Sequence, residues 1–271
     1  MTDSPHVYRR MADETSVFYT WFSAMHTRVD ILISSNKTEE QLIAVSSNIR
    51  QLIADIELTA NCFDEKSELA RANRLAYSQP FNLSPRLEDL LESCFLYNKQ
   101  TEGLFDVTTD SKNYSCETSR HISIQNHQLS YIHSGIRVNL SGFLKGYALD
   151  QVKDLLKRQG ISDGIVSIGN SSVMAIGNQQ NDDGWTVSLQ ESRRKIILHN
   201  QCLTTSGNDS GTRQHIIHPH TGQFIEGRRS VAVVTGNGTE GEVLSTSLFI
   251  GSSAQRQRLL SRFLVYDVID L

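Results

Sequence analysis

The second half of the sequence holds a series of short runs that are apolar or alternate between apolar and polar residues, with turn residues between them. Short runs of this kind are typical of β-strands, because a helix needs a longer stretch with a period near 3.6. A further run at 230–235 is mostly valine, which favours strand structure. This half is therefore predicted to be rich in strands. The other predicted strands of this half are 164–168, 173–176, 185–189, 195–198 and 201–205.

The clearest helix signals lie in the first 160 residues. Thr38 and Gln41 form a capping box, and apolar residues then recur at helical spacing over 42–56. Ser84, followed directly by proline, marks the start of a second helix. A third helix is predicted over 142–159, because apolar residues share one of its faces and a glycine follows it.

Helices and strands alternate without a strict βαβ rhythm. Strands are expected at 17–24 and 29–34, and a polar glycine-rich loop at 236–241 is expected to lead into a helix that starts near Glu242. A last helix and a strand at 263–268 close the chain. A chain of 271 residues suits one large domain or two small ones, at roughly 150 residues per domain. Since no clear boundary appears, we predict an α+β fold: a single two-lobed domain with mixed sheets flanked by helices.

Composition excludes several classes of protein. The net charge is -4 with both signs interspersed, so no basic stripe indicates nucleic-acid binding. No apolar run approaches the roughly 18 residues that a membrane span needs. The first 28 residues lack the pattern of a secretory signal, which predicts a cytoplasmic protein. The cysteines are widely spaced and are predicted to be free thiols in a reducing compartment: Cys62, Cys94, Cys116 and Cys202.

Three histidines lie within six residues, at 215, 218 and 220. Imidazole groups suit zinc, copper or nickel, so one interpretation is a metal site. Pro219 prevents a helix through this segment, and a turn would be needed to bring the rings together. A single loop histidine that acts as a base is a second interpretation. Exposed histidines beside a Pro-x-Thr-Gly turn are the third.

Glu242 and Thr246 lie four residues apart, on one face of a predicted helix start. A carboxylate and a hydroxyl presented together are hard oxygen ligands that suit magnesium. The alternative is an acidic residue that only complements the helix dipole.

Two further segments have the composition of ligand-binding turns. Residues 139–147 open a helix at a Ser-Gly turn and place Lys145 in its first turns, an arrangement that suits an anion. It also fits a plain helix start with a solvated lysine. Residues 169–172 are small and polar between two strands, so they either let a ligand approach the backbone or form an ordinary hairpin turn.

The order of these segments along the chain resembles the ApbE family, the FAD:protein FMN transferases, over about residues 16–270. The most specific pieces are the Lys-Gly-Tyr-Ala-x-Asp run at 145–150, the His-Ile-Ile-x-Pro-x-Thr-Gly run at 215–222, and the acid-x-x-x-Thr pattern that begins at Glu242. The resemblance implies a division into an N-terminal extension, 1–15, and a flavin transferase domain, 16–271.

The resemblance also implies a reaction. Such enzymes cleave the pyrophosphate of FAD and attach FMN through its phosphate to a Thr or Ser of an acceptor flavoprotein, with release of AMP. His215 matches the histidine proposed to act as base on the acceptor hydroxyl. Magnesium would be held by the side chains of Glu242 and Thr246 and by a main-chain oxygen of Gly142. The positions that match contacts to the cofactor are Met25, Phe63, Leu104, Phe105, Asp106, Asn139, Lys145, Gly169, Ser171, Ser206 and His215.

Four positions depart from the family pattern. Glu242, Asn139 and His218 stand where the family usually has aspartates, and His26 stands where it has a glycine. These departures keep two other functions open on the same fold: a non-catalytic FAD-binding protein, and a magnesium-dependent FAD pyrophosphatase that yields FMN and AMP.

Overall fold

The structure of the protein is a computed structural model that describes residues 5–271 except 13, 180–181, 190–191, 193 and 209–215. Within these residues, eight strands form one antiparallel sheet in the order β1-β2-β3-β7-β8-β11-β14-β15. Their bounds are β1 His6–Arg10, β2 Ser16–Ala24, β3 Thr27–Ser35, β7 Asp163–Ile168, β8 Ser172–Ile176, β11 Cys202–Asn208, β14 Arg229–Thr235 and β15 Val265–Asp270.

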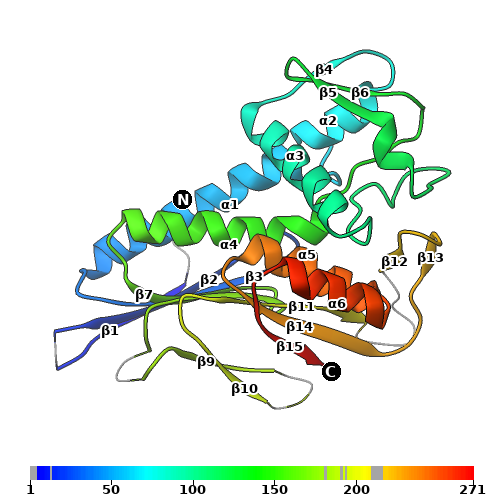
Figure 1. Ribbon diagram of the computed structural model, residues 1–271. Helices are drawn as coiled ribbons and strands as arrows, with labels where there is room; N and C mark the ends of the chain where they lie inside the picture. Colours follow the sequence, from blue (N-terminus) through cyan, green and yellow to red (C-terminus); the bar gives the residue numbers. More distant parts are fainter. Residues whose placement is uncertain (1–4, 13, 180–181, 190–191, 193, 209–215) are drawn as a thin grey trace.

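Four helices cover one face of this sheet (Figure 1). They are α1 Glu39–Ala60, α4 Ser141–Arg158, α5 Gly238–Ile250 and α6 Ser253–Arg262. The other face carries a hairpin of β9 (Trp185–Ser188) and β10 (Lys195–Leu198), whose apolar side chains pack on β8, β11 and β14. The sheet is therefore buried on both sides along its central strands.

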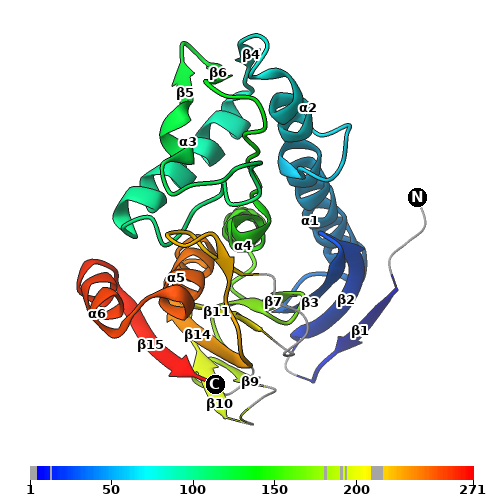
Figure 2. The same ribbon diagram turned by 90° about the vertical axis from the view of Figure 1, so that its right-hand side faces the viewer.

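A second lobe lies at one end of the helix layer (Figure 2). It contains α2 (Glu68–Leu75), α3 (Pro85–Gln100), a short 3₁₀ helix (Thr118–His121) and a small antiparallel sheet. The strands of that sheet are β4 Phe81–Asn82, β5 Ile122–Gln125 and β6 Gln128–Tyr131. One hydrophobic cluster runs from Phe18 of the large sheet to Leu87 and Leu129 of this lobe. The predicted α+β fold of a single two-lobed domain is confirmed.

Most predicted elements are present, and their caps are the expected ones. Thr38 and Gln41 form the capping box of α1, and the Ser84 hydroxyl accepts a hydrogen bond from the Leu87 amide at the start of α3. The four cysteines are free, as predicted. Among the described helices, none has both the length and the apolar character that a bilayer-spanning segment needs.

One helix boundary was predicted wrongly. We expected a loop over 236–241, yet α5 begins at Gly238 with Asn237 as its cap. Glycines disfavour helix in an isolated segment, but here the orphan amides of the first turn find acceptors. The Asn237 side chain accepts from the Glu240 amide at 2.8 Å, and the Asp150 carboxylate accepts from the amides of Gly238 and Thr239 at 2.7 and 2.9 Å. Tertiary contacts thus override local propensity.

Some short elements were not predicted. β1 lies within the expected extension and pairs with β2, and α2 begins at the Ser67 cap. β12 (Ile217–His218) and β13 (Gln223–Phe224) form a two-residue ladder. These elements are too short, or too polar, to give a clear period in sequence.

Glycines set the distance between α4 and α5. A Cβ atom added to Gly146 would lie 2.1 Å from the Gly238 carbonyl oxygen and 2.7 Å from Cγ of Glu242. A Cβ added to Gly238 would meet the Gly146 carbonyl at 2.7 Å. The two helix backbones therefore touch, and this contact places Glu242 directly against α4.

Gly146→Ala should destabilise the protein by about 3 kcal/mol, because the new methyl group meets a main-chain carbonyl that cannot rotate away. Gly142→Ala, in the same helix, is the matched control: its Cβ finds open space within 4 Å, and alanine favours helix by up to about 1 kcal/mol. Urea unfolding of both variants measures the difference. Equal stabilities would mean that the α4–α5 contact is not tight.

Candidate active site

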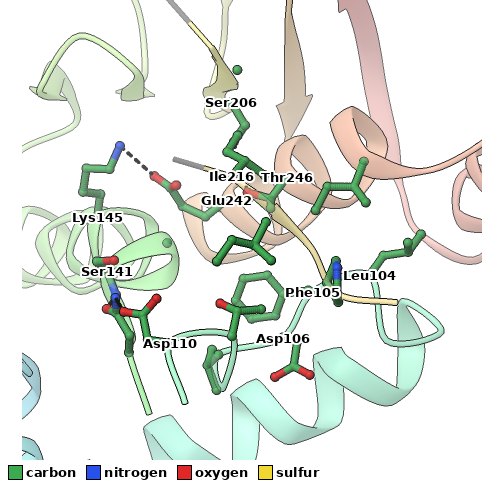
Figure 3. Close-up of a pocket in the computed structure, with 18 of the residues that line it drawn as sticks. Leu104, Phe105, Asp106, Asp110, Ser141, Lys145, Ser206, Ile216, Glu242 and Thr246 are labelled. Atoms are coloured by element: carbon green, nitrogen blue, oxygen red, sulfur yellow. Dashed lines mark hydrogen bonds and ion pairs between the residues drawn. The ribbon is translucent and has the colours of Figure 1, made fainter. Parts of the chain in front are cut away.

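A cavity of about 490 Å³ opens where α4, α5 and β11 meet the loops at 104–110 and 216–219 (Figure 3). Its lining is partly apolar and partly polar. Both loops contribute apolar residues, and polar side chains come from the helices, from the loop at 104–110 and from β11. Lining residues that carry polar side chains include Asp106, Asp110, Asn139, Ser141, Lys145, Ser171, Ser206, Glu242 and Thr246.

Glu242 is the buried charge of this cavity. It is only 3% exposed, and its carboxylate accepts a hydrogen bond from the Ser172 hydroxyl. Lys145 Nζ lies 3.7 Å from the same carboxylate oxygen (Figure 3). Burial raises the pKa of Glu242, while the charge of Lys145 and the Ser172 hydrogen bond act in the opposite direction. Lys145 also donates to the Ser171 hydroxyl at 2.5 Å.

A group of hydroxyls continues the site one turn further along α5. Ser206 Oγ, from β11, lies 2.7 Å from Ser245 Oγ and 3.1 Å from Thr246 Oγ1. Glu242 and Thr246 lie on the same face of α5 and both line the cavity, as their spacing predicted. Gly142 lines the cavity from the first turn of α4. The three predicted metal-ligating positions are therefore together.

This set of donors suits magnesium. The described residues contain no group of three or more His, Cys, Asp or Glu side chains that could hold a metal ion. Magnesium is commonly held by one or two carboxylates, with water and substrate phosphates completing its octahedron. One buried carboxylate, a hydroxyl and a main-chain oxygen beside an open cavity fit that requirement.

Asn139 organises the start of α4. Its side-chain oxygen accepts from the Ser141 amide at 2.9 Å, and its nitrogen donates to Asp110 at 2.7 Å. The Asn139 amide therefore provides an acceptor for a main-chain N–H at the start of α4 and holds Asp110 at the rim of the cavity. Sequence reasoning did not find Asp110, because nothing local distinguishes it from an exposed loop acid.

The Asp106 side chain mainly stabilises the loop that carries it. One of its oxygens accepts from the amide and hydroxyl of Thr108, and the other lies 3.0 Å from the Tyr114 hydroxyl. Figure 3 shows its carboxylate directed away from Glu242. The Tyr114 hydroxyl also lies 3.0 Å from the Pro219 carbonyl, so this tyrosine ties two walls of the cavity together. Burial, with help from Asp106, raises the pKa of Tyr114.

A smaller cavity of about 120 Å³ adjoins the first and shares Asn139, Ser141 and Lys145 with it. Met25, Phe63 and Leu144 give it a more apolar character. Met25 lies in the tight turn between β2 and β3 with φ of +51°, and its amide donates to Glu57 at 2.9 Å. Both predicted residues of this region, Met25 and Phe63, therefore reach the site.

Of the remaining residues that were predicted to contact the cofactor, most line the main cavity and one does not. Leu104, Phe105, Ser171 and Ser206 line the main cavity. Gly169 does not line it: a Cβ at this glycine would meet the Thr27 hydroxyl at 2.8 Å, so it serves close packing of the turn.

The histidine segment is described only in part, because His215 lies outside the described residues. The His218 and His220 rings are 5.6 Å apart, and His220 Nε2 lies 3.0 Å from the Glu102 carbonyl oxygen. Burial lowers the pKa of His218. Of the turn residues, Pro219 lines the main cavity.

Sequence reasoning underestimated Ser172 and did not explain Asp150. Ser172 is fully buried and reaches Glu242 across 70 residues of chain, a pairing that local patterns do not reveal. Asp150 belonged to the run at 145–150, yet its function as the acceptor for the first amides of α5 appears only in three dimensions.

The fold and the site together define a class: two-lobed α+β domains with a buried carboxylate, a lysine and a hydroxyl beside a ligand-sized cavity. Comparison with known proteins makes the assignment specific. Residues 25–269 match the sequence model of the ApbE family. The chain belongs to the ApbE family.

Two curated relatives have the same name. The FAD:protein FMN transferase of Vibrio cholerae serotype O1 is 26% identical over an alignment of 244 residues, which covers 76% of this chain and 73% of that protein. The FAD:protein FMN transferase of Escherichia coli K12 is 24% identical over 258 residues, with 78% of this chain and 72% of that protein covered.

Solved structures share the fold. The flavin transferase ApbE from Vibrio cholerae superposes with a TM-score of 0.77 at 20% identity and covers 99% of this chain and 97% of that one. The apo form of the Pseudomonas stutzeri flavinyl transferase ApbE gives a TM-score of 0.79 at 19% identity, with 95% and 94% covered.

Lys145→Met should destabilise the protein without metal by about 1–3 kcal/mol, because the buried Glu242 carboxylate loses its nearest cation. The double variant Lys145→Met/Glu242→Gln is the control and should recover most of the loss, since no charge is then left alone. Urea unfolding in the presence of EDTA measures both. A single variant as stable as the wild type would show that the pair contributes nothing to folding.

Proposed function

We propose that this member of the ApbE family is an FAD:protein FMN transferase that uses magnesium and modifies a Thr or Ser of an acceptor flavoprotein. The observation that carries the proposal is the convergence of Glu242, Thr246 and Lys145 on one cavity beside an apolar one. FAD likewise has a charged part, its pyrophosphate, and flat ring systems on either side of it. The names of the curated relatives support the same reaction.

The reaction is a phosphoryl transfer. The acceptor hydroxyl oxygen attacks the phosphorus of the FMN half, and a new P–O bond forms to that oxygen. The bond from this phosphorus to the bridging oxygen breaks, and AMP leaves with the bridging oxygen. The hydroxyl proton goes to a base, and the family resemblance assigns that task to His215. Such a reaction depends mainly on positioning and on stabilising charge.

Different residues of the cavities would bind different parts of FAD and the metal ion. Lys145 can turn from Glu242 toward the pyrophosphate, since it is already within the cavity and is 25% exposed. Met25 and Phe63 would contact a ring of FAD in the apolar cavity. Glu242, Thr246 and the Gly142 carbonyl would hold magnesium, which supplies charge neutralisation on the pyrophosphate and on the leaving AMP.

Two departures from the family pattern have local explanations that support activity. Asn139 still accepts a hydrogen bond from the Ser141 amide at the start of α4, and it holds Asp110 at the rim of the cavity, so a carboxylate remains nearby. Glu242 is longer than aspartate, and its added reach is used in the contacts with Ser172 and Lys145.

We also propose a cytoplasmic site of action. Three of the four free cysteines are buried, and unpaired thiols suit a reducing compartment. The catalytic domain is proposed to comprise residues 16–271, with β1 adding an edge strand from the segment before it.

Incubation with FAD, magnesium and a flavoprotein that carries an exposed target threonine should add the mass of FMN to the acceptor and release AMP. EDTA should suppress the reaction, since the negative charges of the pyrophosphate and of Glu242 need a cation to offset them. Intact-mass spectrometry of the acceptor is the measurement. Free FMN and AMP with an unmodified acceptor would indicate a pyrophosphatase instead, and unchanged FAD would indicate a binding protein.

His215→Ala should abolish transfer to the acceptor while FAD binding stays within about twofold of the wild type, because a base acts on the acceptor hydroxyl and not on FAD. Transfer is followed by mass spectrometry and binding by flavin fluorescence. Parallel loss of both would exclude the assignment of His215 as base.

A further inference from the structure

Phe63 stands between two cavities. It lines the apolar one with Met25 and Leu144, and it also lines a wider one with Arg137 and Asp110. Its side chain is 60% exposed, in the loop that joins α1 to α2. The ring therefore borders the apolar cavity that adjoins the main one.

Arg137 lies under this ring. Its guanidinium carbon is 5.5 Å from the ring centroid, within the range of a cation–π contact. One terminal nitrogen is 3.4 Å from the Cys62 carbonyl oxygen. In the described part of the chain, the buried Nε has no hydrogen-bond partner. A buried N–H without a partner is costly. The contacts that hold the guanidinium here are those of its terminal nitrogen with the Cys62 carbonyl and sulfur and its contact with the Phe63 ring.

The backbone of Arg137 is fixed from two sides. The Arg137 amide donates to Ser111 Oγ at 2.9 Å, and the same hydroxyl is 3.2 Å from the Arg137 carbonyl. Its neighbour Val138 exchanges two hydrogen bonds with the side chain of Asn73, at 2.8 and 2.9 Å. The arginine therefore extends from a rigid segment toward a ring on a loop.

We propose that Arg137 is a positioning residue that holds the Phe63 ring ready to stack on a planar ring of FAD. The inference rests on the proposed function, because it takes FAD as the ligand. The guanidinium lies over one face of the phenyl ring, and the 60% exposure of Phe63 leaves area for a stacked ligand. A ring that is already oriented loses less freedom on binding, so part of the affinity for FAD comes from a residue that does not touch it.

The test is a double-mutant cycle on the dissociation constant for FAD, measured by flavin fluorescence in EDTA so that no turnover occurs. Arg137→Met should weaken binding about two- to fivefold, the size of an exposed cation–π contact. Phe63→Leu should weaken it more, about tenfold, because stacking is lost. In the Phe63→Leu background, Arg137→Met should have no further effect.

Arg71→Met is the matched control. It removes a similar pair, with a guanidinium carbon 6.0 Å from the Phe81 ring centroid, at a place that lines neither FAD cavity. It should leave the dissociation constant unchanged. If Arg137→Met does not fold, Arg137→Lys replaces it in the cycle, with a smaller loss expected and again none in the Phe63→Leu background.

Each other outcome overturns the inference in its own way. An unchanged dissociation constant for Arg137→Met would show that the arginine does not assist the ring. Additive losses in the double variant would show that Arg137 contacts FAD itself. Absence of FAD binding by the wild-type protein would remove the proposed function, and the inference with it.

Discussion

The contact between α4 and α5 is the constraint on which the site depends. Two glycines, Gly146 and Gly238, let the helix backbones touch, and Asp150 accepts the first amides of α5 at the same crossing. The carboxylate thus replaces solvent at a helix start that glycines would otherwise leave weak. Because both devices belong to one run of sequence, a single short segment of α4 determines where α5 begins and which way its side chains face.

The burial of the Glu242 carboxylate in the cavity is a consequence of this helix packing. Glu242 comes from the second turn of α5 and is buried because α4 lies so close, so its carboxylate needs neighbours that offset its charge. Lys145 provides a cation from α4, and Ser172 provides a hydroxyl from β8. Three elements that are distant in sequence therefore meet at one carboxyl group. Among the described residues, Glu242 is the one charged side chain in the buried class.

Much of this could be predicted from the sequence, because the signals were local. Short apolar or alternating runs predicted the strands β7 and β8, and the Thr38 capping box predicted the start of α1 correctly. The four-residue spacing of Glu242 and Thr246 placed both in the same cavity. The start of α5 was predicted wrongly, because the acceptor for its first amides lies 88 residues away in sequence. Asp110 and Arg137 escaped notice for the same reason: their importance lies in partners that only folding supplies.

The hydrophobic cluster that passes from the large sheet into the second lobe has a consequence for how the protein selects its ligand. The parts of the two lobes that share this core cannot move apart without breaking it, since interiors are close-packed and deform little. The two lobes are then expected to unfold in one cooperative transition. Selection of the ligand would depend on the fixed shape of the cavity. A ligand must fit the shape it finds, and recognition of the acceptor falls to the surface around the opening.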